Sequence, residues 1–518
     1  MNKMSKTIML SLFSGLAVIA AAYGGYDVLT KQASTEVLQG VEKQDAQGAY
    51  QEYVVEAREA KWELKAGEKI SAWTFNGSVP GSELRVQEGE RVKVVLKNTL
   101  EQPVSIHWHG YPVPNAMDGI PGVTQNAVQP GASFTYEFTA TVPGTYWYHS
   151  HQDSATQVDR GLYGALVVES KEQKVKYDRE FTLLLDEWST EMLGAEQEAT
   201  GHSGHGGGTT SGMDHSGHSD TSAPALSHDE MMQQMYNIFT VNGKAGGEIE
   251  PLQVKKGEKI KLRLINAGFQ THQLNLTNQT FKITHLDGQP LQSSPDVSGA
   301  LLAIAPGERY DVELTAGANF GILCANDSPA KADMAVHVEV DGNDSHEYAA
   351  PAVELSPLDI TAYGKAASVN ANVKYDLETT LLLNNKVVHK DGKSQEVYTI
   401  NGNIHPDIPP LRVKKGQVVK VAMTNEGTSD HPMHLHGHFF QVLSKNGQPL
   451  QGTPLLKDTL NVKPGETYEV AFTADNDGNW MFHCHDLHHA AAGMMTTVEY
   501  DGYQPGFVPD PKAGNRSE

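Results

Sequence analysis

Alternating hydrophobic and polar positions, interrupted by short turns rich in Gly and Pro, recur along most of the chain. The segment RVKVVLKN at residues 91–98 alternates in this way, as do KIKLRLIN at 259–266 and VVKVAMTN at 418–425. Alternation with a period of two places successive side chains on opposite faces of a strand. Many short strands joined by turns predict an all-β protein.

Two kinds of segment occur three times each, in the same order. The first contains an Asn-Gly turn, a second Gly-containing turn and a strand that ends in Asn, and its copies are 75–98, 241–266 and 400–425. The second is a Pro-Gly turn followed by an alternating strand, and its copies begin at Gln129, Ala305 and Lys463. These matches predict three homologous β domains, at residues 51–172, 173–346 and 347–518.

Composition limits the function. The chain has 518 residues, enough for several domains, and a net charge of −23. Such an acidic chain is not expected to bind nucleic acid, whose recognition requires basic surfaces. Only two cysteines are present, Cys324 and Cys484.

The repeats place four His-x-His pairs in register. The first pair lies nine and eleven residues after the Asn that ends the repeated strand, in both the first and the third domain. The second pair lies 18 and 20 residues after the Gly of the Pro-Gly turn, again in both domains. The eight residues are His107, His109, His149, His151, His434, His436, His483 and His485. The second domain has Asn275, Thr277, Ala325 and Asp327 at these counts, so it is expected to be a scaffold without these ligands.

Histidines two residues apart on a strand point to the same face and can converge on one ion or on two adjacent ions. Imidazole ligands without carboxylates suit copper or zinc rather than magnesium or calcium. Four pairs divided between two domains therefore predict a metal site at the interface of the first and third domains.

A second group of candidate ligands surrounds Cys484. His489 follows it by five residues and Met494 by ten, and His431 lies upstream. Two histidines, a thiolate and a weak axial methionine are the ligands of a blue copper site. Met495 is the alternative to Met494, although the spacing favours Met494.

The position of Cys484 between His483 and His485 suggests an electron route. The blue copper would be joined covalently, through one residue on each side, to the histidine cluster. His438 and His488 fall outside both patterns and are expected to lie beside the ligands or at the surface. Cys324 is expected to be a buried apolar thiol, the common state of a free cysteine.

These motifs resemble those of a known family. HWH (107–109), HSH (149–151), HPMHLH (431–436) and HCHxxxHxxxxM (483–494) are similar to the four copper-binding motifs of multicopper oxidases. That family includes laccases, cuprous and ferrous oxidases and bacterial copper-resistance oxidases, and the resemblance covers about residues 50–505. It implies three cupredoxin-like domains, each a Greek-key β-barrel or sandwich, and four copper ions. It also implies coupling of one-electron oxidation of a donor to four-electron reduction of dioxygen to water.

The resemblance alone distributes the ligands among copper types. It implies a type 1 site formed by His431, Cys484, His489 and Met494. It implies type 2 ligands at His107 and His434, and a type 3 pair held by His109, His149, His151, His436, His483 and His485.

Dioxygen reduction also needs protons, so nearby carboxylates matter. Asp118, shortly after the first His-x-His pair, resembles the acid that the family uses near the cluster, although it could equally be part of an Asp-Gly turn. Many bacterial members also have an acid immediately after the last type 1 histidine. That position is Ala490 here, so the second part of the proton route is in doubt, and Asp486 is a candidate substitute.

The N-terminal segment 1–23 is typical of an export signal. Lys3 and Lys6 precede an uncharged apolar stretch at about 8–22, followed by a polar segment, 24–50, that is expected to be a flexible lead-in. The stretch is either a cleaved signal or an uncleaved membrane anchor. We expect the protein to be extracellular or in the cell envelope, and monomeric.

Segment 201–235 interrupts the second domain and is rich in Gly, Ser, His and Met. We expect a loop that handles metal, because imidazole and thioether ligands suit both copper oxidation states; a biased surface loop is the alternative. The favoured function is therefore oxidation of Cu(I) or another metal ion by dioxygen, in copper tolerance. The alternatives are a laccase that acts on phenolic or other organic donors, and a copper-sequestering envelope protein with incidental turnover.

Overall fold

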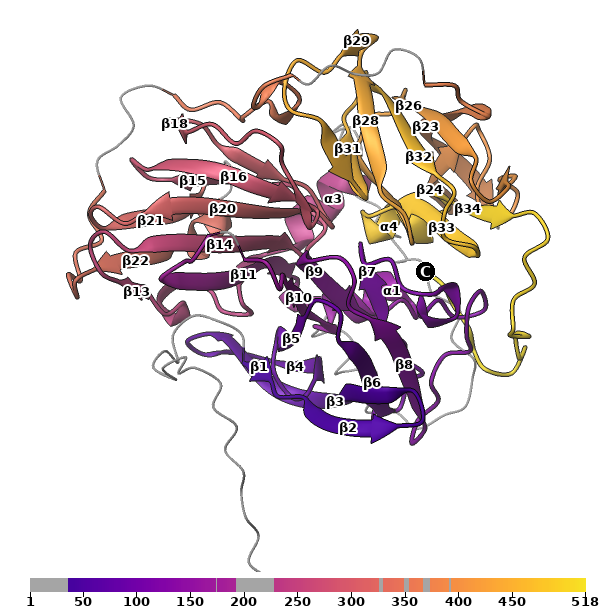
Figure 1. The fold of residues 1–518 in the computed structure, drawn as a ribbon, viewed down its shortest axis with the longest axis horizontal. Helices are drawn as coiled ribbons and strands as arrows, with labels where there is room; N and C mark the ends of the chain where they lie inside the picture. The colour runs from indigo at the N-terminus through magenta and orange to yellow at the C-terminus, as the bar shows by residue number, and fades with distance from the viewer. Residues whose placement is uncertain are drawn as a thin grey trace, which may run out of the picture.

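The computed structural model describes residues 36–173, 175–191, 228–325, 329–348, 354–366, 373–390 and 393–518. The described chain is built almost entirely of strands, which form three pairs of sheets, called domains 1 to 3 below. This confirms the expected all-β architecture with three related units. Figure 1 shows domain 2 on the left, domain 3 at the upper right and domain 1 below, so that each faces the other two.

Domain 1 has two sheets, with strand orders β1-β5-β10-β9-β7 and β2-β3-β6-β8, and β4 pairs with β3. The strands are β1 (Val37–Leu38), β2 (Val41–Asp45), β3 (Gly48–Lys65), β4 (Glu68–Phe75), β5 (Gly81–Gln87), β6 (Arg91–Asn98), β7 (His107–His109), β8 (Ser133–Thr139), β9 (Gly144–His149) and β10 (Tyr163–Glu169). The short helices η1 (Asn115–Met117) and α1 (Ser154–Asp159) lie between strands.

The start of domain 1 differs from the flexible lead-in expected there. Residues 37–50, expected to belong to a flexible lead-in, form β1, β2 and the start of β3. Asp45 at the end of β2 pairs with Arg91 (3.0 Å) and Lys93 (2.8 Å) of β6, which ties this hairpin to the sheet. The expected signal or anchor at 1–23 lies outside the described residues. Among the helices that are described, none is both long and apolar enough to cross a membrane.

Domain 2 has one sheet of order β12-β11-β14-β20-β16-β17, with β18 on β16, and a second of order β13-β22-β21-β15-β19. The strands are β11 (Arg179–Trp188), β12 (Ile238–Val241), β13 (Leu252–Val254), β14 (Lys259–Asn266), β15 (His272–Leu276), β16 (Thr280–Leu286), β17 (Gln289–Pro290), β18 (Val297–Ser298), β19 (Leu302–Ile304), β20 (Arg309–Thr315), β21 (Phe320–Cys324) and β22 (Val336–Val340). Its helices are α3 (His228–Met235), η2 (Gly246–Glu248) and η3 (Pro329–Met334). Helix α3 is the last part of segment 201–235; the remainder of that segment lies outside the described residues.

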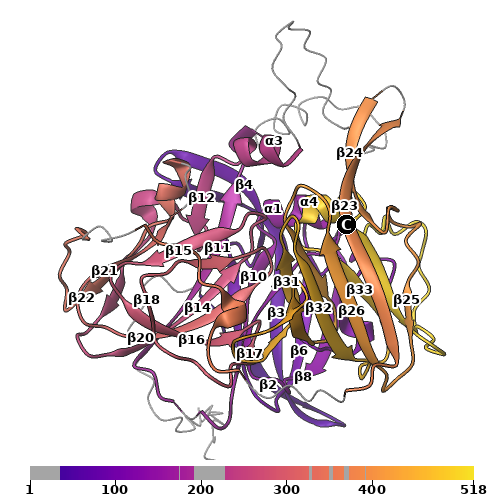
Figure 2. The ribbon, with the colours of Figure 1, turned by 90° about the horizontal axis from the view of Figure 1, so that it is seen from above.

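Domain 3 repeats this topology, with orders β24-β23-β26-β32-β28-β29, with β30 on β28, and β25-β34-β33-β27-β31. The strands are β23 (Leu377–Lys390), β24 (Lys393–Ile400), β25 (Leu411–Val413), β26 (Val418–Asn425), β27 (His431–Leu435), β28 (Phe440–Lys445), β29 (Gln448–Pro449), β30 (Leu455–Lys457), β31 (Thr459–Val462), β32 (Thr467–Thr473), β33 (Asn479–Cys484) and β34 (Met495–Tyr500). The helices are η4 (Ile360–Ala362), before the sheets, and α4 (Leu487–Ala491), between β33 and β34. Figure 2 shows α4 beside α1, where domains 3 and 1 meet.

The repeated Asn has the same structural role in every domain. Asn98, Asn266 and Asn425 are buried, and the side-chain amide of each donates to two backbone carbonyls at 2.7–2.9 Å. These bonds close the turn that leads into β7, β15 or β27. Because buried polar groups require partners, the repeat fixes where the histidine-bearing strands of domains 1 and 3 begin.

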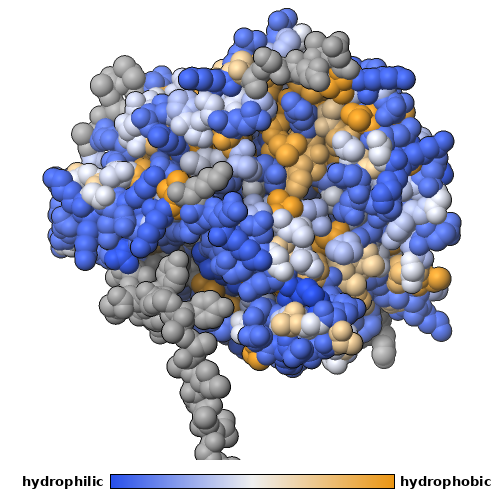
Figure 3. Space-filling view, in the orientation of Figure 1, coloured by the Kyte–Doolittle hydropathy of each residue, from blue (hydrophilic) through white to orange (hydrophobic). Residues whose placement is uncertain are grey.

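Hydrophobic side chains from all three domains meet at the centre of the molecule. This cluster includes Trp147 and Tyr163 of domain 1, Trp188 and Ile265 of domain 2, and Leu487 of domain 3. Hydrophilic residues cover most of the face shown in Figure 3, as expected for a net charge of −23. The shared core holds the histidine strands of domains 1 and 3 against each other.

Candidate metal centres

Cys484 lies at the end of β33, between two imidazoles from different elements. Its Sγ is 3.7 Å from Nδ1 of His431, at the start of β27, and 3.7 Å from Nδ1 of His489, in α4. All three side chains are buried, and their ligand atoms lie within 4.8 Å of one another. Metal–ligand bonds of about 2 Å fit such separations, so these residues could hold one copper ion.

Met494 shares its surroundings with Cys484. The backbone N–H of Cys484 donates to the carbonyl of Met494 at 3.0 Å, and both side chains belong to the same buried cluster. Met495 packs instead with Ile120 and Met481 in a separate cluster. This packing supports Met494 as the weak axial ligand.

Asp486 orients His489. It caps α4, and its carboxylate accepts hydrogen bonds from the backbone N–H groups of His488 and His489. Its Oδ2 also lies 3.4 Å from Nε2 of His489, which leaves Nδ1 of that ring facing Cys484. Asp486 therefore contacts the cysteine-containing group, and not the histidine cluster that a proton donor would have to reach.

The eight histidines of domains 1 and 3 come together at the domain interface. Pairing of β7 with β9 and of β27 with β33 places His107 opposite His149 and His434 opposite His483. The ligand nitrogens form three groups, each within 4.8 Å: His109, His149 and His485; His151, His436 and His483; and His107, His109 and His434. Each group combines residues of both domains.

The ring nitrogens inside this cluster fit a metal. Nδ1 of His107, His149 and His434 donates to a backbone carbonyl at 2.9–3.0 Å. Nε2 of each of these rings is buried and has no hydrogen-bond partner among the described residues. A buried polar atom without a partner costs free energy, and a metal ion would satisfy it.

The protonation state also fits. Burial, assisted by neighbouring imidazoles, lowers the pKa of the cluster histidines well below the usual range: His109, His149, His436, His483 and His485. Burial also lowers the pKa of His151, to about 3. These imidazoles are therefore neutral at physiological pH, the form that binds metal.

Strand β33 connects the two groups of ligands. His483 precedes Cys484 and belongs to one three-histidine group, whereas His485 follows it and belongs to another. Nδ1 of His483 also donates to the carbonyl of Cys484 at 2.9 Å. The thiol is thus joined to two of the three histidine groups, through a single residue on each side.

Asp118 contacts two histidines of the cluster. Its carboxylate oxygens lie 3.0 Å from Nδ1 of His436 and 3.2 Å from Nδ1 of His107, and the side chain is buried. Gly119 has a φ of +80°, and a Cβ there would lie 1.7 Å from the carbonyl oxygen of Ile106. The Asp-Gly turn and the acid near the cluster are therefore one feature, because the turn directs the carboxylate at the histidines.

Replacing Asp118 by Asn should slow dioxygen reduction by about 10²- to 10⁴-fold, the range for loss of a positioned proton-transfer group. Reduction of the blue chromophore by the donor should be unaffected, because Asp118 does not contact Cys484, His431 or His489. Stopped-flow bleaching without oxygen and recovery with oxygen separate the two steps. Asp486→Asn, which alters an acid at the other group, is the control. An unchanged recovery rate in Asp118→Asn would remove Asp118 from the mechanism.

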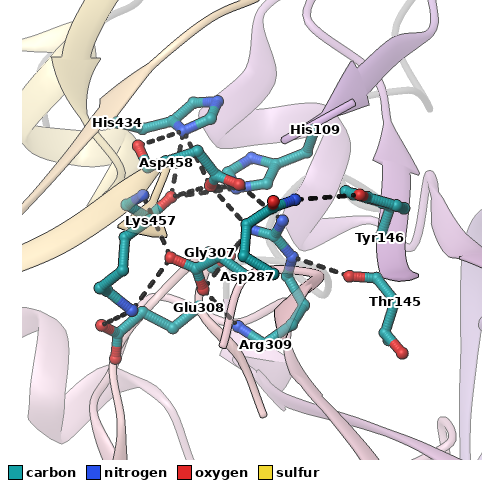
Figure 4. Close-up of polar contacts among 12 residues, drawn as sticks. His109, Thr145, Tyr146, Asp287, Gly307, Glu308, Arg309, His434, Lys457 and Asp458 are labelled. Carbon is teal, nitrogen blue, oxygen red and sulfur yellow. Dashed lines mark hydrogen bonds and ion pairs between the residues drawn. The ribbon is translucent and has the colours of Figure 1, made fainter. Parts of the chain in front are cut away.

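Domain 2 reaches the cluster through Arg309. Its guanidinium pairs with both carboxylate oxygens of Asp458 in domain 3, at 2.7 and 2.6 Å (Figure 4). Asp458 in turn lies 3.4 Å from Nε2 of His109 and 3.4 Å from Nδ1 of His434. All four side chains are buried. Burial alone would raise the pKa of Asp458, but Arg309 outweighs it and holds that pKa low.

Three further charged groups lie beside the Arg309–Asp458 ion pair. Lys457 lies 3.0 Å from both Asp287 and Glu308, and Asp287 accepts the backbone N–H of Arg309 at 3.0 Å (Figure 4). Gly307 has a φ of +81°, and a Cβ there would lie 2.9 Å from the ring of His485. Domain 2 thus supplies polar contacts and close packing that hold the cluster histidines in place.

The prediction that Ala325 and Asp327 of domain 2 are equivalent to the last His-x-His pair is wrong. In the sheet register, the last His-x-His pair of domain 3 corresponds to Leu323 and Ala325, and not to Ala325 and Asp327. Neither side chain is a metal ligand. Cys324, expected to be a buried apolar thiol, is only partly buried, and its Sγ lies 4.0 Å from Nδ1 of His272.

Glu518 is a buried acid at the cluster. Its Oε1 lies 3.4 Å from Nε2 of His151 and 3.5 Å from Nδ1 of His483, and its other oxygen accepts from Ser154. Burial raises the pKa of Glu518 to about 8. At neutral pH the side chain is therefore mostly protonated.

The two remaining histidines have different surroundings. His438 is buried, contacts the hydroxyl of Tyr500 at 2.6 Å and donates to the carbonyl of a cluster histidine at 3.0 Å. Nε2 of His488, on α4, lies 3.0 Å from the hydroxyl of Tyr236, which also donates to Asp159. Both therefore lie beside candidate ligands, and neither belongs to a ligand group.

These groups define a class of protein. Three two-sheet domains with a Cys-His-His-Met group in domain 3, connected by one strand to eight histidines between domains, are typical of an oxidase that uses several copper ions.

Comparison with known proteins leads to the family. Sequence profiles described as multicopper oxidase match residues 56–173, 212–344 and 374–502. The multicopper oxidase MmcO of Mycobacterium tuberculosis is 31% identical over an alignment of 447 residues, and the match covers 84% of each chain. Laccase-2 of Botryotinia fuckeliana is 29% identical, and the match covers 83% of this chain and 78% of that laccase. The crystal structure of a multicopper oxidase from Pseudomonas thermotolerans matches with a TM-score of 0.64 at 28% identity, covering 87% of this chain and 98% of that one.

The chain therefore belongs to the multicopper oxidase family. This confirms the resemblance, the cupredoxin-like fold, the four copper ions of types 1, 2 and 3, and the oxygen-dependent oxidoreductase activity. Dioxygen is the acceptor, and relatives differ in the donor that their names suggest. Besides laccases, they include proteins named copper resistance protein A and iron transport multicopper oxidase.

Proposed function

We propose that the ligand groups of the structure hold the four coppers in the following way. The type 1 ion is held by His431, Cys484, His489 and Met494. The type 3 pair is held by His109, His149 and His485 on one side and by His151, His436 and His483 on the other, and the type 2 ion by His107 and His434. Copper held by these residues would supply one-electron transfer from the donor to dioxygen. The separation into one sulfur-containing group and three histidine groups supports this assignment.

Two carboxyl groups serve the proton side of the reaction. Asp118 contacts His107 and His436 and keeps both rings oriented. Glu518 contacts His151 and His483, and burial keeps it mostly protonated at neutral pH, so it can supply a proton. It thereby takes the role that Ala490, which lacks a carboxyl group, cannot fill.

The donor that we favour is a metal ion, in particular Cu(I). The observation that carries this proposal is the link between α3, which bears three methionines, and α4, which bears the type 1 ligand His489. Tyr236 immediately follows α3 and contacts His488 of α4 at 3.0 Å. Thioether side chains prefer soft ions such as Cu(I), so α3 can bring the donor next to the electron-accepting site.

Methionine substitutions in α3 test this proposal. Met231 and Met235 are partly exposed, whereas Met232 is buried in the core. Replacing Met231 and Met235 together by Leu should lower kcat/KM for Cu(I) about tenfold, equivalent to about 1.4 kcal/mol. Oxidation of a phenol should change by less than about twofold, because Met→Leu conserves volume.

Met232→Leu is the matched control and should leave both activities unchanged. Deletion of 201–227 tests the rest of the segment in the same assay, and it too should impair Cu(I) oxidation more than phenol oxidation. Equal loss of both activities would argue against a role in metal delivery.

A laccase that oxidises organic donors is the second candidate, favoured by relatives named laccase. Oxygen uptake of the copper-loaded enzyme with Cu(I), Fe(II), Mn(II) and a phenol ranks the donors. A copper-sequestering role is less well supported, because storage requires no electron route such as that through β33. A sequestering protein would bind Cu(I) without matching oxygen uptake.

We further propose that the chain is exported, as residues 1–23 suggest, and works outside the cell or in the cell envelope, with that segment cleaved or retained as an anchor. We propose that it is a monomer, because every ligand group is complete within one chain.

A further inference from the structure

Domain 2 contains a Cys-His pair at the place that corresponds to the type 1 group of domain 3. In domain 3, β27 pairs with β33, and the residue opposite Cys484 lies two positions after His431. In domain 2, β15 pairs with β21, and the residue opposite Cys324 also lies two positions after a histidine, His272. The two pairs of side chains therefore occupy equivalent positions in homologous sheets.

The contacts of His272 prepare it to bind a metal. The side chain is fully buried, and its Nδ1 lies 4.0 Å from Sγ of Cys324, close to the 3.7 Å found at Cys484. Its Nε2 donates to Glu187 at 3.1 Å, and Glu187 is itself held by two backbone N–H groups at 2.7 and 2.8 Å. A carboxylate that holds one ring nitrogen leaves the other directed at a metal. Asp486 acts on His489 in the same way.

Met334 takes the place of the axial ligand. It follows Cys324 by ten residues, as Met494 follows Cys484. The pairing of β21 with β22 ends at Ile322 opposite Val336; Cys324 lies two residues beyond Ile322, and Met334 lies two residues before Val336, in η3. In domain 3 the pairing of β33 with β34 ends at His483 opposite Met495, and Cys484 and Met494 are the next residues. Met334 is buried and ends η3, which packs against β21.

We propose that His272, Cys324 and Met334 form a fifth metal site that binds Cu(I). The residue five positions after Cys324 is a proline, so the second histidine of a type 1 site is missing. A set of one imidazole, one thiolate and one thioether suits Cu(I), whereas zinc in structural sites takes four ligands. Burial would lower the pKa of His272, but its contacts with Cys324 and Glu187 raise it to about 9. Binding therefore displaces both the thiol proton and the Nδ1 proton of His272, and both leave to solvent.

The surroundings indicate binding without turnover. Cys324 is partly exposed, so an ion can enter from solvent, whereas Cys484 is fully buried. Its chain neighbours, Leu323 and Ala325, offer no ligand, so the short covalent route that joins Cys484 to the cluster does not exist here. The site therefore holds or transfers Cu(I), and this conclusion does not depend on which donor the enzyme oxidises.

Alkylation provides a specific test, because the chain has only two cysteines and copper covers Cys484 in the fully loaded enzyme. The loaded enzyme is treated with iodoacetamide without oxygen, at free Cu(I) concentrations set by a chelator, and modification of Cys324 is followed by mass spectrometry. Saturating Cu(I) should slow the modification at least about tenfold. His272→Gln and Met334→Leu should each require about ten times more free Cu(I) for equal protection, a change of about 1.4 kcal/mol.

Met232→Leu, a buried methionine of the same domain, is the control and should behave as the unmodified chain. The blue absorption at Cys484 reports that each variant is folded. If His272→Gln fails to fold, Met334→Leu alone decides, because this exchange conserves volume. Absence of protection in the unmodified chain would overturn the proposal, as would protection of Met334→Leu at unchanged Cu(I) concentrations, which would show that Met334 is not a ligand. The assay measures no turnover, so its failure would leave the proposed donor untouched.

Discussion

Replacing Cys484 by Ser is expected to abolish the blue absorption band and oxidase turnover together. The band requires a thiolate bound to copper, and a serine hydroxyl neither ionises at neutral pH nor offers a soft donor. Turnover should stop as well, because Cys484 connects the type 1 group to His483 and His485. Absorption spectroscopy and oxygen uptake on the purified, copper-loaded variant measure the two effects.

Cys324→Ser is the matched control for this experiment. It removes the other thiol of the chain, which lies in domain 2 and adjoins no cluster ligand. Both the blue band and turnover should therefore persist. Retained turnover in Cys484→Ser would disprove the electron route through β33. Loss of the blue band in Cys324→Ser would show that Cys484 is not the cysteine of the chromophore.

The cluster histidines could be predicted from sequence because their spacing reflects local geometry. A strand directs residues two apart to one face, and a buried Asn such as Asn98 or Asn425 fixes the turn before the strand. Spacing from these landmarks is therefore the same in domains 1 and 3. For this reason the sequence indicates both the four His-x-His pairs and the two domains that share them.

The spacing from Gly307 does not locate the equivalents of His483 and His485 in domain 2, because the connection between β20 and β21 is shorter than that between β32 and β33. From Thr315, the last residue of β20, to Phe320 is five positions, whereas the corresponding step from Thr473 to Trp480 is seven. A count that starts at Gly307 therefore passes the true equivalents by two positions. Only the strand pairing shows that the equivalent of Cys484 is Cys324.

Contacts between distant segments could not be predicted. Arg309 stands where the other two repeats have Ser133 and Thr467, and a charged residue at a buried strand start was the available signal. Its partner Asp458 is 149 positions away, and no local pattern connects them. Glu518 is likewise distant from His151 in sequence, and only the folded chain brings the two side chains together. The sequence therefore does not indicate Glu518 as a replacement for the acid that is missing at position 490.

Replacing Arg309 by Leu should remove copper from the cluster while sparing the type 1 site. The change leaves Asp458 as a buried charge without its main partner, and breaking such a pair costs about 3–5 kcal/mol. Asp458 contacts His109 and His434, so the damage falls on ligands of the type 2 and type 3 ions. Copper content, the type 2 signal in electron paramagnetic resonance and the blue band measure the loss, and the melting temperature should fall.

Arg263→Leu distinguishes damage to the cluster from general destabilisation. Arg263 is also a buried arginine of domain 2, pairing with Glu180 at 2.7 Å and Asp311 at 3.4 Å, but within the described part of the chain no contact joins these acids to a histidine of the cluster. This control should lose stability to a similar extent yet retain all four coppers and turnover per folded molecule. Arg309→Lys, which keeps the charge but loses the two-pronged contact, should fall between. If Arg309→Leu kept its full copper content, the cluster would not need the contact from Arg309, and Asp458 alone would suffice to hold His109 and His434.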